Sequence, residues 1–152
     1  VESNKKHLVA FRSTASLALY MSTKLKYLVP GVHLSTHADG NLIENLIDIR
    51  EGDCLIVYTF PLYSTSSSIS IDIAKQKGAK IILITDKLTT PFAKKADLVF
   101  TITIESIDFW NNYIAASAFN DLLLVAISLL VVPGVEDRIK EMSNLLVQYG
   151  VQ

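Results

Sequence analysis

The sequence has few of the residues that build covalent or metal cross-links. Its single cysteine, Cys54, lies within an apolar run and has no partner in the chain, so neither an intrachain disulfide nor a cysteine-based metal cage can form. His33 and His37 are four residues apart, but we expect them on a strand and the loop after it, not on one helical face. The sequence therefore predicts no metal site, and it fits a reducing compartment, the cytoplasm.

An excess of positive charge and a glycine-rich phosphate loop are also missing. The 14 Lys and Arg residues are balanced by 15 Asp and Glu residues, and the net charge is -1. Because no basic field is available for a nucleic acid backbone, this chain is not expected to bind DNA by itself. The fingerprint of dinucleotide-binding domains is missing after the first apolar run, as is its acidic partner about 20 residues later. We predict no cofactor.

No apolar run has the length of a bilayer span. The longest stretch, residues 122–132, includes Ser128 and falls short of the roughly 20 residues that a span requires, so we interpret it as a buried helix. Residues 1–6 have neither the apolar core of a signal peptide nor an initiator Met. With 152 residues, of which 50% are hydrophobic, we expect residues 1–152 to form a single domain excised from a longer chain, without membrane contact.

Short apolar runs that alternate with helical patterns indicate the fold class. Continuous apolar runs are typical of strands covered on both faces, and they occur at residues 8–11, 54–58, 81–84 and 98–104, with a weaker fifth at 32–34. Helical spacing occurs between them, at about residues 14–28, 41–48, 67–77, 91–95 and 107–132, with a last helix after Pro133-Gly134. This alternation predicts an α/β protein, a three-layer α/β/α sandwich around a flavodoxin-like, doubly wound, parallel five-stranded sheet.

Ligands of such sheets bind at the carboxyl ends of the strands, and the third predicted strand ends in a hydroxyl-rich loop. Seven of the twelve residues from 59 to 70 are Ser or Thr. Hydroxyls beside the N-H groups of a helix start form a cradle suited to a phosphate dianion. The same residues are favoured helix caps, so capping or a plain surface loop is the alternative interpretation.

The loop after the first predicted strand holds Arg12, Ser13 and Thr14 and faces the hydroxyl-rich loop across the switch point of the sheet. The guanidinium of Arg12 matches phosphate geometry and would supply the charge that the hydroxyls lack. A solvated Arg at a loop tip is the alternative interpretation.

Four motifs carry a resemblance to a known family. They are IVYTFPLYS at 56–64, AKQKGA at 74–79, ILITD at 82–86 and PFAKKADLV at 91–99. In order and spacing they resemble the patterns Ile-Ser-Phe-x-x-Tyr-Ser, Ala-x-x-x-Gly-Ala, Ile-Thr-Asp and Pro-Leu-Ala-x-x-Ala-Asp of the sugar isomerase (SIS) domain in RpiR-family transcriptional regulators. The resemblance implies a phosphosugar-binding SIS fold that follows an N-terminal helix-turn-helix domain, so that DNA is bound only through a domain absent from this chain.

The resemblance also implies site residues and partners. Thr59 stands where the family usually has its first loop Ser, and Tyr63 and Ser64 match its Tyr-Ser pair, so these residues and the neighbouring Thr65 are ligand candidates together with Arg12, Ser13 and Thr14. The expected partners are a sugar phosphate as effector and a second copy of the chain, in a homodimer or higher homo-oligomer with the pocket near the interface.

The sequence departs from the family at both loops. The family's Gly-x-Gly-x-Ser appears here as residues 10–14, AFRST, without either glycine. Enzymes of the fold have Ser-x-Ser-Gly-x-Thr in the second loop, where Pro61 and Leu62 replace the second Ser and the Gly. Side chains in place of glycine keep the backbone away from a ligand, so an altered ligand, weaker affinity or lost binding all remain open.

Two other functions remain open beside the sensor. A sugar-phosphate isomerase would need a Glu or His base, and the candidates are His33, His37, Glu44 and Glu105, although such residues near turns are more often solvated; we predict no catalytic residue. An oligomerisation scaffold would use the long apolar helix, with Trp110, Tyr113 and Phe119 suited to a subunit contact or, alternatively, packed on the sheet.

Overall fold

Five parallel strands form a single sheet at the centre of the molecule. The computed structural model describes residues 2–107 and 109–151. The strand order is β2-β1-β3-β4-β5, and every neighbouring pair is parallel. The strands are β1 Lys6–Ala10, β2 Val32–Ser35, β3 Cys54–Tyr58, β4 Lys80–Thr85 and β5 Leu98–Thr101. All five predicted strands are therefore confirmed, including the weak candidate that became β2.

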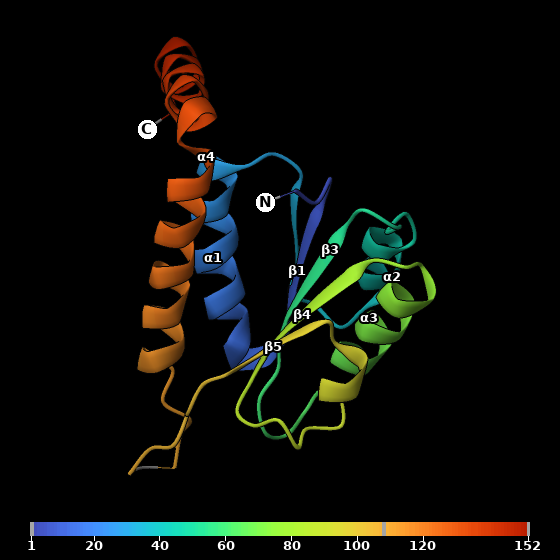
Figure 1. The fold of residues 1–152 in the computed structure, drawn as a ribbon. Coiled ribbons are helices and arrows are strands. Elements are labelled where there is room, and N and C mark those ends of the chain that lie inside the picture. The colour runs from blue at the N-terminus through green and yellow to red at the C-terminus, as the bar shows by residue number, and fades with distance from the viewer. Residues whose placement is uncertain (1, 108, 152) are drawn as a thin grey trace.

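Helices cover both faces of this sheet (Figure 1). The helices are α1 Ala15–Leu28, α2 Gly40–Leu46, α3 Thr65–Gln76 and α4 Ile114–Gln148, with 3-10 turns η1 Arg12–Thr14 and η2 Ala93–Lys95. Helices α1 and α4 lie on one face, and α2 and α3 lie on the other. The predicted three-layer α/β/α sandwich with a doubly wound sheet is confirmed.

Side chains of each central strand alternate between two apolar cores. Leu8 and Ala10 of β1 point into the core with α1 and α4, whereas Val9 points into the core with α2 and α3. Both faces of β1 and β3 are buried along their whole length, which is why β3 is apolar throughout and β1 is apolar from Leu8 onward; Lys6 and His7, the first two residues of β1, are buried polar side chains. The two cores fix the carboxyl ends of β1 and β3 next to each other, at the edge where the functional loops begin.

Three predicted boundaries were wrong near the end of the sheet. The fifth strand ends at Thr101, not at Ile104, and the helix expected from residue 107 begins at Ile114. The helix expected at 91–95 is a single 3-10 turn at Ala93–Lys95. An apolar run does not distinguish a strand from an extended loop, because a loop that packs against the domain also buries apolar side chains.

Helix α4 contradicts two further predictions. The stretch 122–132 was expected to be buried, yet Leu122, Leu129 and Leu130 are each at least 70% exposed, because α4 contacts α1 and the sheet along one side only. The helix also continues through Pro133-Gly134, where a break was expected. Proline removes one backbone hydrogen bond without ending a long helix, and Figure 1 shows the axis changing direction between the orange and red parts of α4.

By length and composition, part of α4 could cross a membrane. Residues 114–131 have a mean hydropathy of 2.1, and 17% of this window is buried. Within the window, however, Asp121 accepts a hydrogen bond of 2.5 Å from the Tyr20 hydroxyl of α1, and Asn120 is fully buried against the domain. These polar contacts tie this part of α4 to α1 and to the sheet.

We expect a buried histidine on β1 to make the stability of the fold dependent on pH. The ring of His7 is stacked on that of His33 in β2, with 5.0 Å between centroids, and its Nε2 atom has no hydrogen-bond partner in the described part of the chain. Burial, and next the neighbouring His33, lower the pKa of His7 below its ordinary value of 6.5. The unfolded chain therefore binds a proton at a higher pH than the folded chain does.

We expect the free energy of unfolding to fall as pH drops below about 6.5, because the unfolded state takes up the proton first. Urea denaturation of the wild type and of His7→Phe at pH 7.5 and pH 5.5 measures this contribution. The variant should lose less stability between the two pH values than the wild type, whereas His37→Phe, which replaces an exposed histidine, should lose as much. An equal loss in His7→Phe and the wild type would contradict the assignment.

Candidate functional site

A cavity of about 550 Å³ opens at the carboxyl ends of β1 and β3. Its lining comes from three segments, which are the turn after β1 (residues 11–14), the end of β3 with the following loop and α3 (58–62, 64 and 67), and the loop before α4 (109–111 and 113). Strands β1 and β3 are neighbours, but their chains lead to helices on opposite faces of the sheet, so the loops diverge there. The cavity thus lies at the switch point, where the sequence predicted the ligand site.

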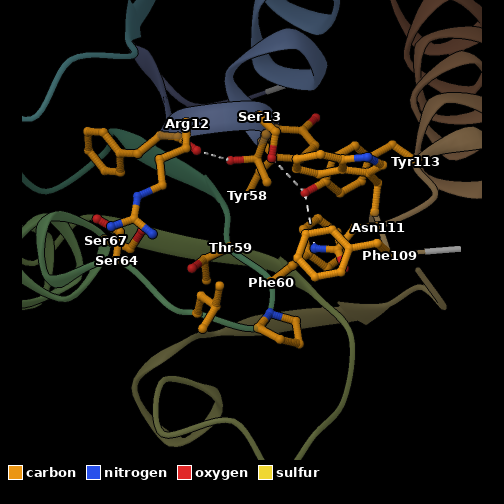
Figure 2. A pocket seen from close by; sticks show the side chains of 15 residues that line it. Arg12, Ser13, Tyr58, Thr59, Phe60, Ser64, Ser67, Phe109, Asn111 and Tyr113 are labelled. Carbon is orange, nitrogen blue, oxygen red and sulfur yellow. Dashed lines mark hydrogen bonds between the residues drawn. The ribbon is translucent and has the colours of Figure 1, made fainter. Parts of the chain in front are cut away.

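Arg12 extends from the 3-10 turn η1 into this cavity. Figure 2 shows its side chain pointing toward the side of the cavity that Ser64 and Ser67 line. Arg12 is the one Lys or Arg among the described lining residues, so it supplies the positive charge of the site. Arg12 therefore lines the cavity and is at the same time exposed to solvent.

Left-handed backbone survives at two positions where the family pattern has glycine. The φ angle is +58° at Arg12 and +70° at Leu62. A residue with a Cβ atom is destabilised in this conformation by about 1–2 kcal/mol, which glycine avoids. Arg12 and Leu62 therefore hold a backbone conformation that glycine would adopt without this cost.

Three hydroxyls from the hydroxyl-rich segment 59–70 line the cavity: those of Thr59 and Ser64 in the loop after β3, and that of Ser67 in the first turn of α3. Ser64 is also the N-cap of α3, since its side chain accepts a hydrogen bond of 3.2 Å from the N-H of Ser66. Its own hydroxyl proton remains available as a donor. Capping and ligand binding, which the sequence offered as alternatives, are thus compatible for this residue.

The hydroxyls of the first loop are already engaged. Thr14 is buried and donates to the carbonyl oxygen of Phe11 at 2.7 Å, so toward a ligand it could only accept. Ser13 shares a hydrogen bond of 3.0 Å with the Tyr113 hydroxyl, which also accepts from Nδ2 of Asn111 at 3.4 Å. Both residues line the cavity, but Thr14 offers no donor to an anion.

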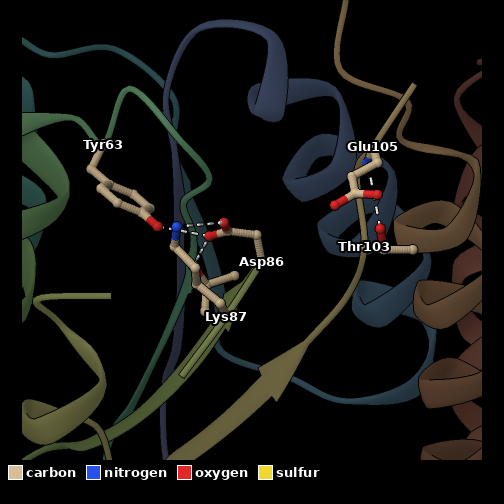
Figure 3. A network of polar contacts seen from close by, with 6 residues as sticks. Tyr63, Asp86, Lys87, Thr103 and Glu105 are labelled. Atoms are coloured by element: carbon tan, nitrogen blue, oxygen red, sulfur yellow. Dashed lines mark hydrogen bonds and ion pairs between the residues drawn. The ribbon is translucent and has the colours of Figure 1, made fainter. Parts of the chain in front are cut away.

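Tyr63 and Thr65 do not line this cavity. The Tyr63 hydroxyl donates to Oδ1 of Asp86 at 2.7 Å (Figure 3). The Tyr63 ring meets that of Phe92 edge to face. Burial, and next the hydrogen bond to Asp86, raise the pKa of Tyr63. Thr65 is exposed at the first turn of α3. The structure therefore separates these two candidates from Arg12, Thr59 and Ser64.

Other lining residues were not expected from the sequence. Four aromatic side chains, Phe60, Phe109, Trp110 and Tyr113, line the cavity without having been predicted as ligand contacts. Ser67 belongs to the hydroxyl-rich segment 59–70 but was not named as a ligand candidate, and it is buried at the cavity wall in the first turn of α3. The aromatic ring of Phe60 lies 5.7 Å from that of Tyr113 between centroids. These aromatic side chains come together only because two loops about 50 residues apart in the sequence are in contact, so no local sequence pattern could have predicted their place in the lining.

A buried hydrogen-bond bridge connects the cavity floor to both helices of one layer. The Tyr58 hydroxyl donates to Oδ1 of Asn120 at 2.7 Å, and Nδ2 of Asn120 donates to the carbonyl oxygen of Leu17 at 3.0 Å. Tyr58 and Asn120 are fully buried, and burial raises the pKa of Tyr58. The bridge holds β3, α4 and α1 together directly beneath the site.

None of the four possible catalytic bases lines the cavity. His33, His37, Glu44 and Glu105 are all exposed to solvent elsewhere, as Figure 3 shows for Glu105, which lies beside Thr103. No Asp, Glu or His occurs among the described residues that line the cavity. The lining can therefore hold an anion by charge and hydrogen bonding, but its described part offers no base for proton transfer between carbons.

Comparison with curated proteins gives a relative among transcriptional regulators. The chain is 31% identical over 85 residues to the HTH-type transcriptional regulator RpiR of Escherichia coli strain K12. The match covers 55% of this chain and 29% of that protein, so the chain matches less than a third of the curated relative.

Comparison with solved structures gives the same fold. The RpiR transcription factor from Sphaerobacter thermophilus (sugar isomerase domain) superposes with a TM-score of 0.89 at 19% identity, over 94% of this chain and 80% of that one. The Vibrio vulnificus NanR protein complexed with ManNAc-6P gives a TM-score of 0.76 at 9% identity, over 99% of this chain and 58% of that one. The family model described as the SIS domain matches residues 2–126, and the chain therefore belongs to the SIS domain family.

Proposed function

We propose that this SIS domain binds a sugar phosphate and senses it for a bacterial transcriptional regulator of the RpiR type. The observation that carries the proposal is the placement of Arg12 toward Ser64 and Ser67, at the N-terminus of α3 and inside the cavity at the switch point. A guanidinium, neutral hydroxyls and the positive end of a helix dipole together suit a phosphate dianion.

The relatives support this ligand class. The chain is similar to an HTH-type transcriptional regulator, and the NanR structure of the same fold is a complex with ManNAc-6P. A further structure of this fold, from Escherichia coli, is also a complex with a phosphosugar and gives a TM-score of 0.73. In our proposal, DNA is bound by a helix-turn-helix domain outside residues 1–152, in the cytoplasm, and the SIS domain supplies the ligand response.

We propose a sensor in preference to an isomerase because of the chemistry of the cavity. An aldose-ketose isomerase needs a base within hydrogen-bond reach of the proton that it moves. The described lining residues contain no carboxylate and no imidazole. A bound sugar phosphate would accordingly be held and released unchanged.

The test is a thermal-shift screen against sugar phosphates, followed by product analysis of each hit. A ligand that binds only the native state stabilises it by about 2.7 kcal/mol at 100 times its Kd, so a sensor should show a higher Tm with some sugar phosphates and no product. Consumption of a hit would show an isomerase instead. If no phosphate compound raises the Tm, only the function of an oligomerisation scaffold remains.

We also propose that the domain dimerises through α4. Ile114, Leu122, Val125 and Leu129 recur at helical spacing on the side of α4 that faces away from the domain, and each is more than 55% exposed. Such a stripe suits a second copy of the same helix. Phe119 does not belong to it, since its ring packs on Phe100 within the domain at 4.8 Å.

The double variant Leu122→Glu/Leu129→Glu is expected to convert a dimer into a monomer, because four charges would face one another across the contact. Size-exclusion chromatography with light scattering measures the mass of each species. Val147→Glu, a change of an equally exposed residue near the end of α4, serves as the control and should remain dimeric. A wild-type chain that is monomeric at all concentrations would exclude this contact.

A further inference from the structure

The side chain of Tyr63 lies outside the cavity, although its neighbours in the sequence line it. Pro61, Leu62 and Ser64 are lining residues, whereas Tyr63 is not. Figure 3 shows the Tyr63 ring extending from the loop after β3 toward Asp86, the residue that directly follows β4. Any effect of Tyr63 on a ligand in the cavity must therefore pass through the loop itself.

The Tyr63 hydroxyl is held by a carboxylate at the carboxyl end of β4. It donates to Oδ1 of Asp86 at 2.7 Å, and the same oxygen accepts a hydrogen bond of 3.2 Å from the Thr85 hydroxyl. The side chain of Asp86 is only 15% exposed, so the contact is shielded from most competing water. The Tyr63 ring also packs edge to face on Phe92, with 5.6 Å between centroids. A hydrogen bond to an ionised group is stronger than one between neutral groups, so this contact is a firm anchor.

The loop after β3 is attached to the end of β4 at both of its own ends. At its start, the N-H of Thr59 donates to the carbonyl oxygen of Ile84 at 3.0 Å. At its end, the Tyr63 side chain is bonded to Asp86. Between these points Leu62 has a φ angle of +70°, and its side chain is 86% exposed, so packing of that side chain does little to hold the unfavourable backbone. The anchor of Tyr63 directly follows this strained residue.

We infer that Tyr63 and Asp86 are positioning residues of the anion site. Their hydrogen bond holds the loop in the path that directs the Thr59 and Ser64 hydroxyls into the cavity. Ser64 follows Tyr63 directly and is the N-cap of α3, so a shift of Tyr63 displaces both this hydroxyl and the N-H groups of the helix start. The inference rests on the proposed function, because a sugar phosphate is the ligand that these groups and Arg12 would bind.

Tyr63→Phe tests the inference, because it keeps the ring against Phe92 and removes only the hydroxyl. We would titrate the folded wild type and variant by calorimetry with inorganic phosphate, glucose 6-phosphate, fructose 6-phosphate and ribose 5-phosphate. The affinity for each anion that binds the wild type should fall about 3- to 10-fold, which corresponds to one lost hydrogen bond. A role in stability alone would lower the midpoint of urea unfolding and leave the Kd of the folded protein unchanged.

Tyr20→Phe is the matched control for this substitution. Tyr20 donates to a carboxylate oxygen of Asp121 in the same way, but it does not line the cavity and belongs to neither loop of the anion site. The control therefore removes the same kind of hydrogen bond elsewhere in the fold, and it should keep the wild-type affinity.

Two variants of Asp86 separate its role as an acceptor from that of its charge. Asp86→Asn keeps an oxygen that can accept from Tyr63, so its affinity should stay close to the wild-type value. Asp86→Ala removes the acceptor and should lose about as much affinity as Tyr63→Phe, and the double variant Tyr63→Phe/Asp86→Ala should lose little more than either single variant. If only the negative charge mattered, both Asp86 variants would bind an anion more tightly by the same factor.

The results distinguish this inference from the proposed function. If Tyr63→Phe binds the anions as tightly as the wild type, or if Asp86→Asn and Asp86→Ala change the affinity equally, the pair does not position the loop and the anion site itself stands. If neither inorganic phosphate nor any of the sugar phosphates binds the wild type, both proposals are wrong.

Discussion

Replacing Arg12 by glycine should weaken sugar phosphate binding and at the same time stabilise the fold. The guanidinium is the positive charge among the described lining residues, and a hydrogen bond to a charged group contributes about 1.5–3 kcal/mol. Its loss corresponds to a decrease in affinity of about 10- to 100-fold. The φ angle of +58° at this position suits glycine, so the free energy of unfolding should rise by about 0.5–1 kcal/mol.

Calorimetric titration and urea denaturation measure the two effects on the same variant. Leu62→Gly is the matched control, because Leu62 has a φ angle of +70° and an exposed, uncharged side chain. It should gain similar stability and, because it removes no charge, lose much less affinity than Arg12→Gly does. Arg12→Lys should keep part of the affinity, since it retains the charge without the planar fork. Undiminished binding by Arg12→Gly would show that the anion is held elsewhere.

Removing the buried bridge beneath the cavity should cause the largest loss of stability. In Asn120→Ala the buried Tyr58 hydroxyl loses its acceptor, and an unsatisfied buried polar group destabilises a protein by about 1–3 kcal/mol. The carbonyl oxygen of Leu17 loses the donor that ties α1 to α4. The midpoint of urea unfolding should fall accordingly.

A double-mutant cycle with Tyr58→Phe isolates the contact. Tyr58→Phe and Asn120→Ala should each destabilise the fold, and the double variant should lose less than the sum of the two, because each single change leaves the other partner unpaired. Asn144→Ala makes the same substitution at an exposed position of α4 and should have little effect. Strict additivity of the two changes would mean that the hydrogen bond contributes nothing.

The sequence predicted the architecture well because buried strands can be recognised from short stretches of sequence. Strands β1 and β3 are buried on both faces. Their apolar residues therefore form continuous runs that can be recognised from the sequence alone. The prediction failed for α4, where an apolar stretch is exposed in the single chain. An apolar pattern indicates that a helix face packs against another surface. It does not indicate whether that surface belongs to the same chain or to a second molecule.

The site was predicted in part, for a related reason. Thr59, Ser64 and Arg12 follow strand ends, and the topology of the sheet brings such positions together. Tyr63 also follows β3, but its hydroxyl bonds to Asp86, which is 23 residues away in the sequence, so its side chain does not line the cavity. The aromatic lining residues were not predicted as ligand contacts. Trp110, for example, reaches the cavity from the loop between β5 and α4, and the course of this loop depends on where β5 ends.

The left-handed turns at Arg12 and Leu62 make this pocket suitable for redesign. The backbone at both positions has a positive φ angle although Arg and Leu both carry a Cβ atom, so the surrounding fold already holds this conformation against its cost. Side chains there extend from the cavity lining into or beside the space that a ligand would occupy. Substitutions at these two positions could therefore exchange the charge and size of the pocket mouth in a library of variants, while the scaffold that carries them stays the same.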